Sequence, residues 1–272
     1  LSSTKNLIDT LSVEGGQIIP RTIMTTDTRP KESAREFETS KGVFRIAGTA
    51  KGSGMIAPNM ATMLAFIITD APIAKKDQDG IFRPIVEKTF NAITIDGDTS
   101  TNDTAILLSP RGSESISSSQ DLASFEEALY DVCRELAYLL VKDAEGGTKC
   151  VTVTVQGAAN SSDAKKIARS VSESLLVKTA IFGSDPNWGR IACAAGYSGV
   201  NFDAHDLAIS IGGIQLLSAG EPIATDMEKL SAVMKNNEYT VLISIGKGEG
   251  SFSFMTSDLS YDYVKINGEY ST

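Results

Sequence analysis

The pattern of hydrophobic and polar positions predicts both helices and strands along this chain. The clearest helix is expected over residues 121–141, where apolar side chains recur at steps of three and four residues and form one continuous face. A second helical pattern begins at Lys75. Apolar runs bounded by turn residues predict strands. These runs lie at residues 18–26, 42–48, 63–68, 150–155, 177–182 and 261–266.

Two further pairs of strands are expected to form hairpins. Gly212-Gly213 separates residues 207–211 from 214–217, and paired glycines supply the positive φ angles that tight hairpin turns need. The loop 246–250 separates a second pair of expected strands, residues 239–245 and 251–255. Helices that alternate with hairpins indicate a mixed α/β fold (α+β) in layers, with sheets that are at least partly antiparallel. With 272 residues, the chain forms one large domain or two smaller ones.

The charge and composition narrow the class of protein. The net charge is −9 at pH 7, and no basic run compensates for it locally. A nucleic-acid surface or an anionic membrane surface requires clustered Lys and Arg, so neither partner is expected. No apolar run approaches the roughly 20 residues needed to cross a bilayer. The longest, Met63–Ile68, is expected to be a core strand.

The three cysteines, Cys133, Cys150 and Cys193, form no CxxC pair and lie within apolar patterns. They are therefore expected to be buried free thiols in a reducing compartment. No signal peptide is recognised, so the expected location is the cytoplasm. The chain begins with Leu1 instead of Met, and we expect that an N-terminal segment precedes it in the native protein.

Candidate chemistry concentrates in residues 51–70. A glycine-rich lead-in and a Pro58-Asn59 turn are followed by Ala61 and by Thr62, which opens the apolar run. A threonine hydroxyl is a poor nucleophile unless a base takes its proton. The residue's own α-amino group, with a pKa of about 7.7–8.0, would serve if the chain were cut after Ala61. From spacing alone, however, an Ala-Thr pair at the start of a strand is usually only structural.

Other kinds of site have weaker support. His205 is the only histidine, lies in a loop that is expected to be solvated, and has no GxSxG motif to pair with. No GxxxxGK[ST] or GxGxxG spacing is present, so nucleotide binding is not expected. Carboxylates alternate in the loop 96–104, but position 12 of a calcium loop would be Leu107 instead of Glu. No metal is expected, and this segment is better explained as a hydrogen-bonded loop beside an active site.

Three motifs strengthen the threonine hypothesis. They are KGSGMIAPNMATMLAFIITDA at 51–71, DGDTSTNDT at 96–104 and DPNWGR at 185–190. Together they closely resemble the ornithine acetyltransferase / glutamate N-acetyltransferase family of arginine biosynthesis, and the match extends over essentially the whole chain. The resemblance implies a mixed, layered αββα sandwich similar to the N-terminal-nucleophile hydrolases.

The resemblance also implies a precursor that cuts itself before the motif threonine, giving α and β chains. Residues 1–61 would then be the C-terminal part of the α-chain region, and residues 62–272 would be the β-chain region. Thr62 would be the catalytic nucleophile, released by cleavage between Ala61 and Thr62. The substrate-binding residues implied are Thr25 of TTDT, Lys51 of KGSGM, Thr62, Glu145 of AEGGTK, and Asn267 and Thr272 of the C-terminal NxxxxT.

These residue types suit an amino-acid substrate, because Lys51 would meet its carboxylate and Glu145 its ammonium group. Without the resemblance, a solvated lysine in a glycine loop and a glutamate at a helix C-terminus would be the preferred explanations. The activity implied is transfer of an acetyl group from N2-acetylornithine to glutamate through an acetyl-threonine enzyme, by a ping-pong route. No metal or other cofactor is required, and acetyl-CoA is allowed as an additional co-substrate.

The partners implied are the two small-molecule substrates and the α and β fragments of one precursor, in an α2β2 assembly. The compartment would be the cytoplasm, or the mitochondrial matrix if the source is a fungus or another eukaryote. One family feature is not found. The resemblance implies an oxyanion hole in a Ser-Thr-Gly turn of the α-chain region. Residues 1–4 of this chain do not match that motif.

Removing an oxyanion donor typically costs about 10²–10³ in rate. Two alternatives stay open, the first because of the missing donor and the second because pocket shape decides the acceptor. One is a non-catalytic or truncated relative that binds N-acyl amino acids or a partner subunit. The other is an amide hydrolase of the same fold, in which water replaces glutamate as the acceptor.

Overall fold

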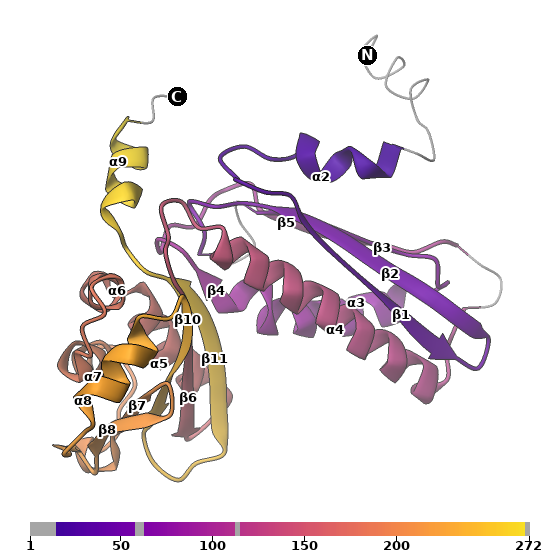
Figure 1. Cartoon of the computed structure of the whole chain (residues 1–272). Coiled ribbons are helices and arrows are strands. Elements are labelled where there is room, and N and C mark those ends of the chain that lie inside the picture. The colour runs from indigo at the N-terminus through magenta and orange to yellow at the C-terminus, as the bar shows by residue number, and fades with distance from the viewer. Residues whose placement is uncertain (1–14, 58–62, 112–114, 270–272) are drawn as a thin grey trace.

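The computed structural model describes residues 15–57, 63–111 and 115–269, which form two β-sheets covered by helices (Figure 1). The mixed α/β class, with layers of sheet and helix, is therefore confirmed. Among these residues no helix is both long and apolar enough to cross a membrane. Short 3-10 turns complete the described chain: η1 (Gly15–Gln17), η2 (Phe90–Ala92) and η3 (Ala204–Asp206).

The first sheet has four strands in the order β1-β2-β3-β5. Its strands are β1 (Lys31–Thr39), β2 (Gly42–Lys51), β3 (Leu64–Thr69) and β5 (Thr104–Leu108). The strands β1, β2 and β3 are successively antiparallel, whereas β5 is parallel to β3. The regions 1–61 and 62–272 thus share one sheet, and the proposed boundary between them stays a prediction.

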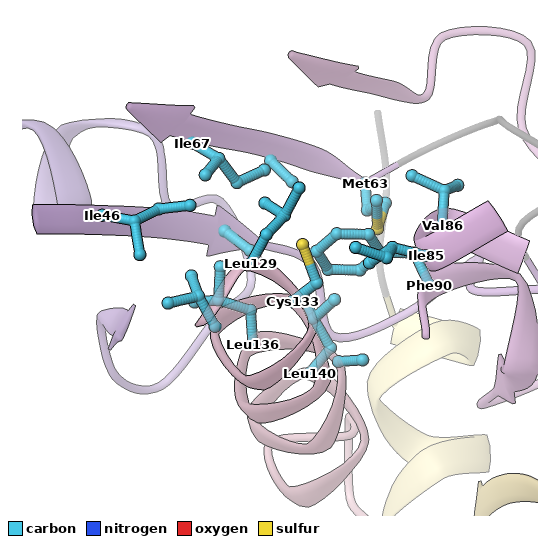
Figure 2. Close-up of a cluster of buried hydrophobic side chains, with 14 of the residues drawn as sticks. Ile46, Met63, Ile67, Ile85, Val86, Phe90, Leu129, Cys133, Leu136 and Leu140 are labelled. Carbon is cyan, nitrogen blue, oxygen red and sulfur yellow. The ribbon is translucent and has the colours of Figure 1, made fainter. Parts of the chain in front are cut away.

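Two helices, α3 (Lys75–Lys88) and α4 (Ser119–Lys142), cover one face of this sheet (Figure 1). The predicted apolar face of α4 is confirmed, since Leu129 and Leu136 are fully buried and α4 packs against β1 and β2. Figure 2 shows both side chains directed toward Ile46 and Ile67 of the sheet. Gly48 permits this close packing, because a Cβ atom there would lie 2.9 Å from Leu136 Cδ1.

The opposite face of the first sheet carries the short helix α2 (Ile19–Thr22) (Figure 1). The extended conformation expected for residues 18–26 is wrong here. Pro20 lies in the first turn of α2, where its fixed φ favours a helix and its missing N–H costs nothing. Ile19 of α2 and Phe66 and Ile68 of β3 line an apolar hollow on this face.

The second sheet has seven strands in the order β4-β11-β6-β10-β7-β8-β9. Its strands are β4 (Ile93–Thr94), β6 (Cys150–Ala158), β7 (Ala208–Ile211), β8 (Ile214–Ser218), β9 (Glu221–Pro222), β10 (Glu238–Ser244) and β11 (Gly250–Ser257). The helices beside it are α5 (Ser161–Glu173), α6 (Leu175–Phe182), α7 (Trp188–Gly196) and α8 (Met227–Met234), and α9 (Tyr261–Glu269) extends beyond its end (Figure 1). Alternate residues of β6, Val151, Val153 and Val155, point into a core shared with α5 and α7.

The two predicted hairpins have different outcomes. The β7–β8 hairpin is confirmed, and both of its turn glycines have positive φ angles. The second hairpin is wrong, because β10 and β11 do not pair with each other. The central strand β6 lies between them, parallel to β10 and antiparallel to β11.

Two segments predicted as strands are helices instead. Residues 177–182 belong to α6, whose start is capped by the Ser174 hydroxyl as it accepts the N–H of Val177 at 3.4 Å. Residues 261–266 belong to α9, and Ser260 accepts the Tyr263 N–H at 3.1 Å. Short apolar runs do not distinguish a strand from a helix, so the capping residues decided these cases.

The cysteines are only partly as expected. Cys133 and Cys150 are buried, and burial raises the pKa of each thiol to about 12. Cys193 is exposed on α7, so the expectation of burial is wrong for this residue.

A buried ion cluster joins the loop before β1 to the end of α4. The Lys31 ammonium is fully buried and lies 2.5 Å from Asp27 Oδ1 and 2.6 Å from Asp143 Oδ2. Asp27 also accepts the Gly52 N–H at 2.7 Å, and Asp143 accepts the Thr28 N–H at 3.0 Å. The buried cation therefore has two opposite charges, and each carboxylate has additional hydrogen bonds, which is the condition under which burial is tolerated.

We expect Lys31→Met to lower the free energy of unfolding by about 3–5 kcal/mol at pH 7, because Asp27 would remain buried without a cation and Asp143 would keep only the half-exposed Arg29. Urea unfolding followed by circular dichroism measures this. The matched control is Lys75→Met, which breaks another Lys–Asp pair spaced by four residues, on the exposed side of α3. The control should change stability little, since exposed pairs contribute little. Equal losses in the two variants would contradict the role of the cluster.

The loss in Lys31→Met should also depend on pH. Burial by itself raises the pKa of Asp27 and Asp143, but hydrogen bonds from Lys31 and the loop outweigh it and hold each pKa below 3.8. Because the folded-state pKa values are lowered, the two carboxylates stabilise the protein fully at pH values above their unfolded-state pKa. This stabilisation is lost as the pH falls through the folded-state pKa. Without Lys31 burial dominates and the two pKa values rise. The difference from wild type should therefore shrink between pH 7 and pH 4, whereas a constant difference would contradict this account.

Candidate active site

The described site residues gather at one end of the first sheet, where β2 ends and β3 begins. Lys51 is the register partner of Leu64, and Leu64 is in turn the partner of Thr104 in β5. Directly opposite residues in antiparallel strands lie about 4.5–5.5 Å apart between Cα atoms. Lys51 therefore lies beside Leu64, the first residue of β3. Leu64 follows Thr62 by two positions in the sequence. Thr62 itself, with Ala61 and Thr272, lies outside the described residues.

The chain enters β3 at a well-anchored point. Met63, the residue after Thr62, is 3% exposed, and its side chain lies in the core beside Phe90 and Ile85 (Figure 2). Its carbonyl accepts the N–H of Thr104 at 2.8 Å. Both the side chain and the backbone of Met63 are thus held, so the start of β3 is fixed by the core and by β5.

The TTDT segment lies against the end of β2. Asp27 accepts the Thr25 N–H at 3.1 Å through one oxygen and the Gly52 N–H at 2.7 Å through the other. The hydroxyls of Thr26 and Ser53 are 2.8 Å apart. One buried carboxylate therefore places Thr25, which is exposed, beside the segment that carries Lys51.

Glu145 approaches the same segment from the end of α4. Its N–H donates to the Ser53 carbonyl at 2.8 Å, and its half-buried carboxylate lies over Gly54. A Cβ atom on Gly54 would lie only 2.4 Å from Glu145 Oε2, so a larger residue would displace the carboxylate. Asn267 of α9 donates from Nδ2 to the same oxygen at 3.1 Å. Two predicted substrate-binding residues, 122 positions apart, are therefore in direct contact.

The electrostatic character of this region follows from two groups. Lys51 is half-buried, and within the described part of the chain its ammonium pairs with no carboxylate. Glu145 has an amide partner in Asn267 but no cationic partner among the same residues. A cation and an anion that do not neutralise each other are thus both available to a ligand with opposite charges.

The loop 96–104 borders the site, in agreement with the sequence interpretation. Asp96 accepts the N–H groups of Met55 at 2.6 Å and Ile56 at 2.9 Å, and the Thr99 hydroxyl donates to the Ala57 carbonyl at 2.8 Å. The loop therefore holds the backbone that leads from Lys51 toward Ala61. In the described residues, no group of three or more His, Cys, Asp and Glu side chains is arranged to hold a metal ion.

Two other features lie outside this cluster. His205 is exposed in η3, as the sequence indicated. DPNWGR forms the turn after α6 and the start of α7, where Asn187 caps α7 by accepting the Arg190 N–H at 3.1 Å. That contact gives the motif a role in the local fold.

Sequence reasoning missed the polar residues that position the site. Asp27, Lys31 and Asp143 form the buried cluster, and Asp96 and Tyr263 join the loop 96–104 to α9. The four-residue spacing of Asp27 and Lys31 was the only local signal, and such spacing is common on exposed surfaces. Nothing in the sequence indicated that Asp143 would reach a lysine 112 positions away.

Comparisons with known proteins identify the family of this chain. A family model described as "ArgJ family" matches residues 2–272. The chain is 45% identical to "Glutamate N-acetyltransferase" of Methanocaldococcus jannaschii, over 98% of this chain and 69% of that protein. It is 48% identical to "Arginine biosynthesis bifunctional protein ArgJ" of Geobacter sulfurreducens, over 93% of this chain and 66% of that protein.

The fold is also similar to a solved structure. The crystal structure of arginine biosynthesis bifunctional protein ArgJ from Bacillus halodurans matches with a TM-score of 0.73 and 40% identity, over 77% of this chain and 100% of that chain. The chain spans about two thirds of the length of the two curated relatives, 69% and 66%. Because the family match covers nearly every residue and both sequence and fold agree, the chain belongs to the ArgJ family.

Proposed function

We propose that this chain forms the acetyl-transfer centre of an enzyme that moves an acetyl group from N2-acetylornithine to glutamate, with Thr62 as the nucleophile. The observation that carries the proposal is the meeting of Lys51, Thr25, Glu145 and Asn267 around the backbone that leads to Thr62. Family membership adds support, since relatives bear the names glutamate N-acetyltransferase and ArgJ.

Cleavage before Thr62 would supply the base for the reaction. The new α-amino group, with a pKa of about 7.7–8.0, is partly neutral at physiological pH and lies on the same residue as the hydroxyl. The solved ArgJ chain covers 77% of this chain and all of itself. The segment 62–272 makes up about 78% of the chain. This agreement in length supports a β chain that begins at Thr62.

The fold would keep a cleaved chain together. After a cut before Thr62, β2 of the upstream fragment would remain paired with β3 of the downstream fragment along six register positions. Met63 would stay anchored in the core. The α2β2 assembly and the cytoplasmic location, or the mitochondrial matrix in a eukaryote, stay predictions.

The proposed reaction proceeds through two acyl transfers. The Thr62 hydroxyl attacks the acetyl carbonyl of N2-acetylornithine while its α-amino group takes the proton. The amide C–N bond then breaks, the proton passes to the leaving amine, and ornithine departs from an acetyl ester on Thr62. The α-amine of glutamate attacks this ester, N-acetylglutamate leaves, and the threonine oxygen regains its proton.

Binding of the substrates would use the two uncompensated charges. Lys51 would pair with the carboxylate of the amino-acid substrate and Glu145 with its ammonium group. Thr25, Asn267 and Thr272 would add neutral hydrogen bonds. This route needs no metal or nucleotide cofactor, and acetyl-CoA as a second acetyl donor stays a prediction.

Intact-mass analysis of the purified protein tests the nucleophile. We expect two fragments divided between Ala61 and Thr62 in the wild type. Thr62→Ala should remain uncut and inactive, since it has no hydroxyl for either step. Thr62→Ser is the control and should still be cut. An active preparation that stays intact would contradict the amine as base.

Product analysis separates the alternatives. Incubation with N2-acetylornithine and glutamate should release ornithine and N-acetylglutamate in equal amounts. Acetate in place of N-acetylglutamate would indicate an amide hydrolase. Binding of N2-acetylornithine by an uncut protein, without turnover, would indicate a non-catalytic relative.

The pocket can be tested by changing the space beside Glu145. Gly54→Ala should raise the KM for N2-acetylornithine about tenfold, because its methyl group would push the carboxylate away and weaken a charge-assisted contact. Glu145→Gln should have a similar effect. Gly80→Ala is the control, since a Cβ atom there meets nothing within 4 Å. An unchanged KM in both site variants would contradict the role of Glu145.

A further inference from the structure

Asp96 links two segments that lie far apart in the sequence. Its Oδ2 atom accepts the Met55 N–H at 2.6 Å and the Tyr263 hydroxyl at 3.2 Å. Its Oδ1 atom accepts the Ile56 N–H at 2.9 Å. A single carboxylate thus contacts both the backbone that leads to Thr62 and the C-terminal helix α9.

The segment 52–57 is held from two sides. On one side, Ser53 and Gly54 contact Glu145. On the other side, Asp96 accepts two N–H groups, and the Ile95 N–H donates to the Ile56 carbonyl at 2.6 Å. The backbone at this point is held against both Glu145 and the loop 96–104.

Met55 shows why the carboxylate is needed there. Its φ angle is +53°, in the left-handed region that side chains other than glycine rarely adopt. The side chain is 52% exposed, so packing does not impose this conformation. The short hydrogen bond from its N–H to Asp96 is charge-assisted and offsets the backbone strain.

Helix α9 depends on polar contacts in the same way. None of its residues is buried. It is attached by Tyr263 to Asp96, by Asn267 to Glu145, and at its start by Ser260, whose hydroxyl donates to the Gly146 carbonyl at 2.5 Å. Partial burial of the Tyr263 side chain, together with the negative charge of Asp96, raises the pKa of Tyr263, so its hydroxyl keeps its proton and acts as the donor.

We infer that Asp96 and Tyr263 are positioning residues that couple the placement of α9, and with it Asn267, to the backbone leading into Thr62. The inference rests on the proposed function for its effect on the reaction, but the coupling itself is structural. Asp96 acts on both partners, because it holds the Met55–Ile56 backbone as well as Tyr263. Tyr263 acts only on the α9 side. Replacing Tyr263 should therefore affect only α9, whereas replacing Asp96 should affect both α9 and the Met55–Ile56 backbone.

The test uses the purified protein with Tyr263→Phe and Asp96→Asn. Tyr263→Phe should raise the KM for N2-acetylornithine about tenfold, leave kcat and cleavage before Thr62 near wild type, and speed amide hydrogen exchange in residues 261–269. Asp96→Asn should speed the same exchange, raise KM and also slow cleavage. The asparagine side chain offers only one acceptor oxygen. Its NH2 group would face an N–H or O–H group that now donates to Asp96, so at least one of these hydrogen bonds would be lost.

Two variants serve as matched controls. Tyr261→Phe changes another tyrosine of α9, which is 82% exposed and touches Phe182 through its ring. Asp98→Asn changes another carboxylate of the same loop, which is exposed. Both should match wild type in exchange, KM and cleavage.

Hydrogen exchange keeps this inference separate from the proposed function, since it needs no turnover. Faster exchange of α9 in Tyr263→Phe but not in Tyr261→Phe would support the coupling even in a protein without acetyltransferase activity. Unchanged exchange in Tyr263→Phe would overturn it, even in an active enzyme. If Asp96→Asn does not fold, Tyr263→Phe still decides the question, because it leaves the bonds from Asp96 to the backbone intact. Cleavage at the wild-type rate in a folded Asp96→Asn protein would overturn the role of Asp96.

Discussion

The burial of the Lys31 ammonium between Asp27 and Asp143 is the constraint on which the site depends. A buried cation must keep its opposite charges close, so the loop before β1, the first residue of β1 and the end of α4 have little freedom relative to one another. Each predicted site residue nearby lies within two positions of this cluster or of its partner Gly52. Thr25 precedes Asp27 by two residues, Lys51 precedes Gly52 by one, and Glu145 follows Asp143 by two. The cluster therefore fixes the segments that carry these predicted site residues.

A second set of polar contacts brings the C-terminal part of the chain to the same place. Asp258 accepts the N–H groups of Thr148 and Lys149 at 2.8 and 3.0 Å, directly before α9 begins. Nearby, the Lys178 amine is buried and donates to the Ser257 carbonyl. Burial lowers the pKa of Lys178 to about 8, although the charges of Asp258, Asp96 and Glu173 oppose the shift. The end of β11 and the approach to α9 are thus held by polar groups with defined partners.

The elements that the sequence predicted well are those with long or regular patterns. Helix α4 has 24 residues, and Phe125, Leu129, Val132 and Leu136 of its predicted apolar face are buried. The strands β2, β3 and β6 and the hairpin β7–β8 also agree, because each has a clear apolar run or a glycine turn. The strand β1 was missed, since much of it is exposed and its sequence, KESAREFET, is mostly polar. The segments that became α6 and α9 are short, and a short apolar run has no period long enough to separate a helix from a strand.

The sequence by itself determined the chemical character of this protein: the motif around Thr62, the types of residue that would bind an amino acid, the mixed α/β class and the family. Only the tertiary structure decided that Glu145 meets Asn267, that Lys51 lies beside the start of β3, and that β6 separates β10 from β11. The physical reason is that local patterns depend on neighbouring residues, whereas these contacts join residues that are distant in the sequence. These contacts form because buried charges need opposite charges and the backbone groups of strands need hydrogen-bond partners, however far away in the sequence those partners lie.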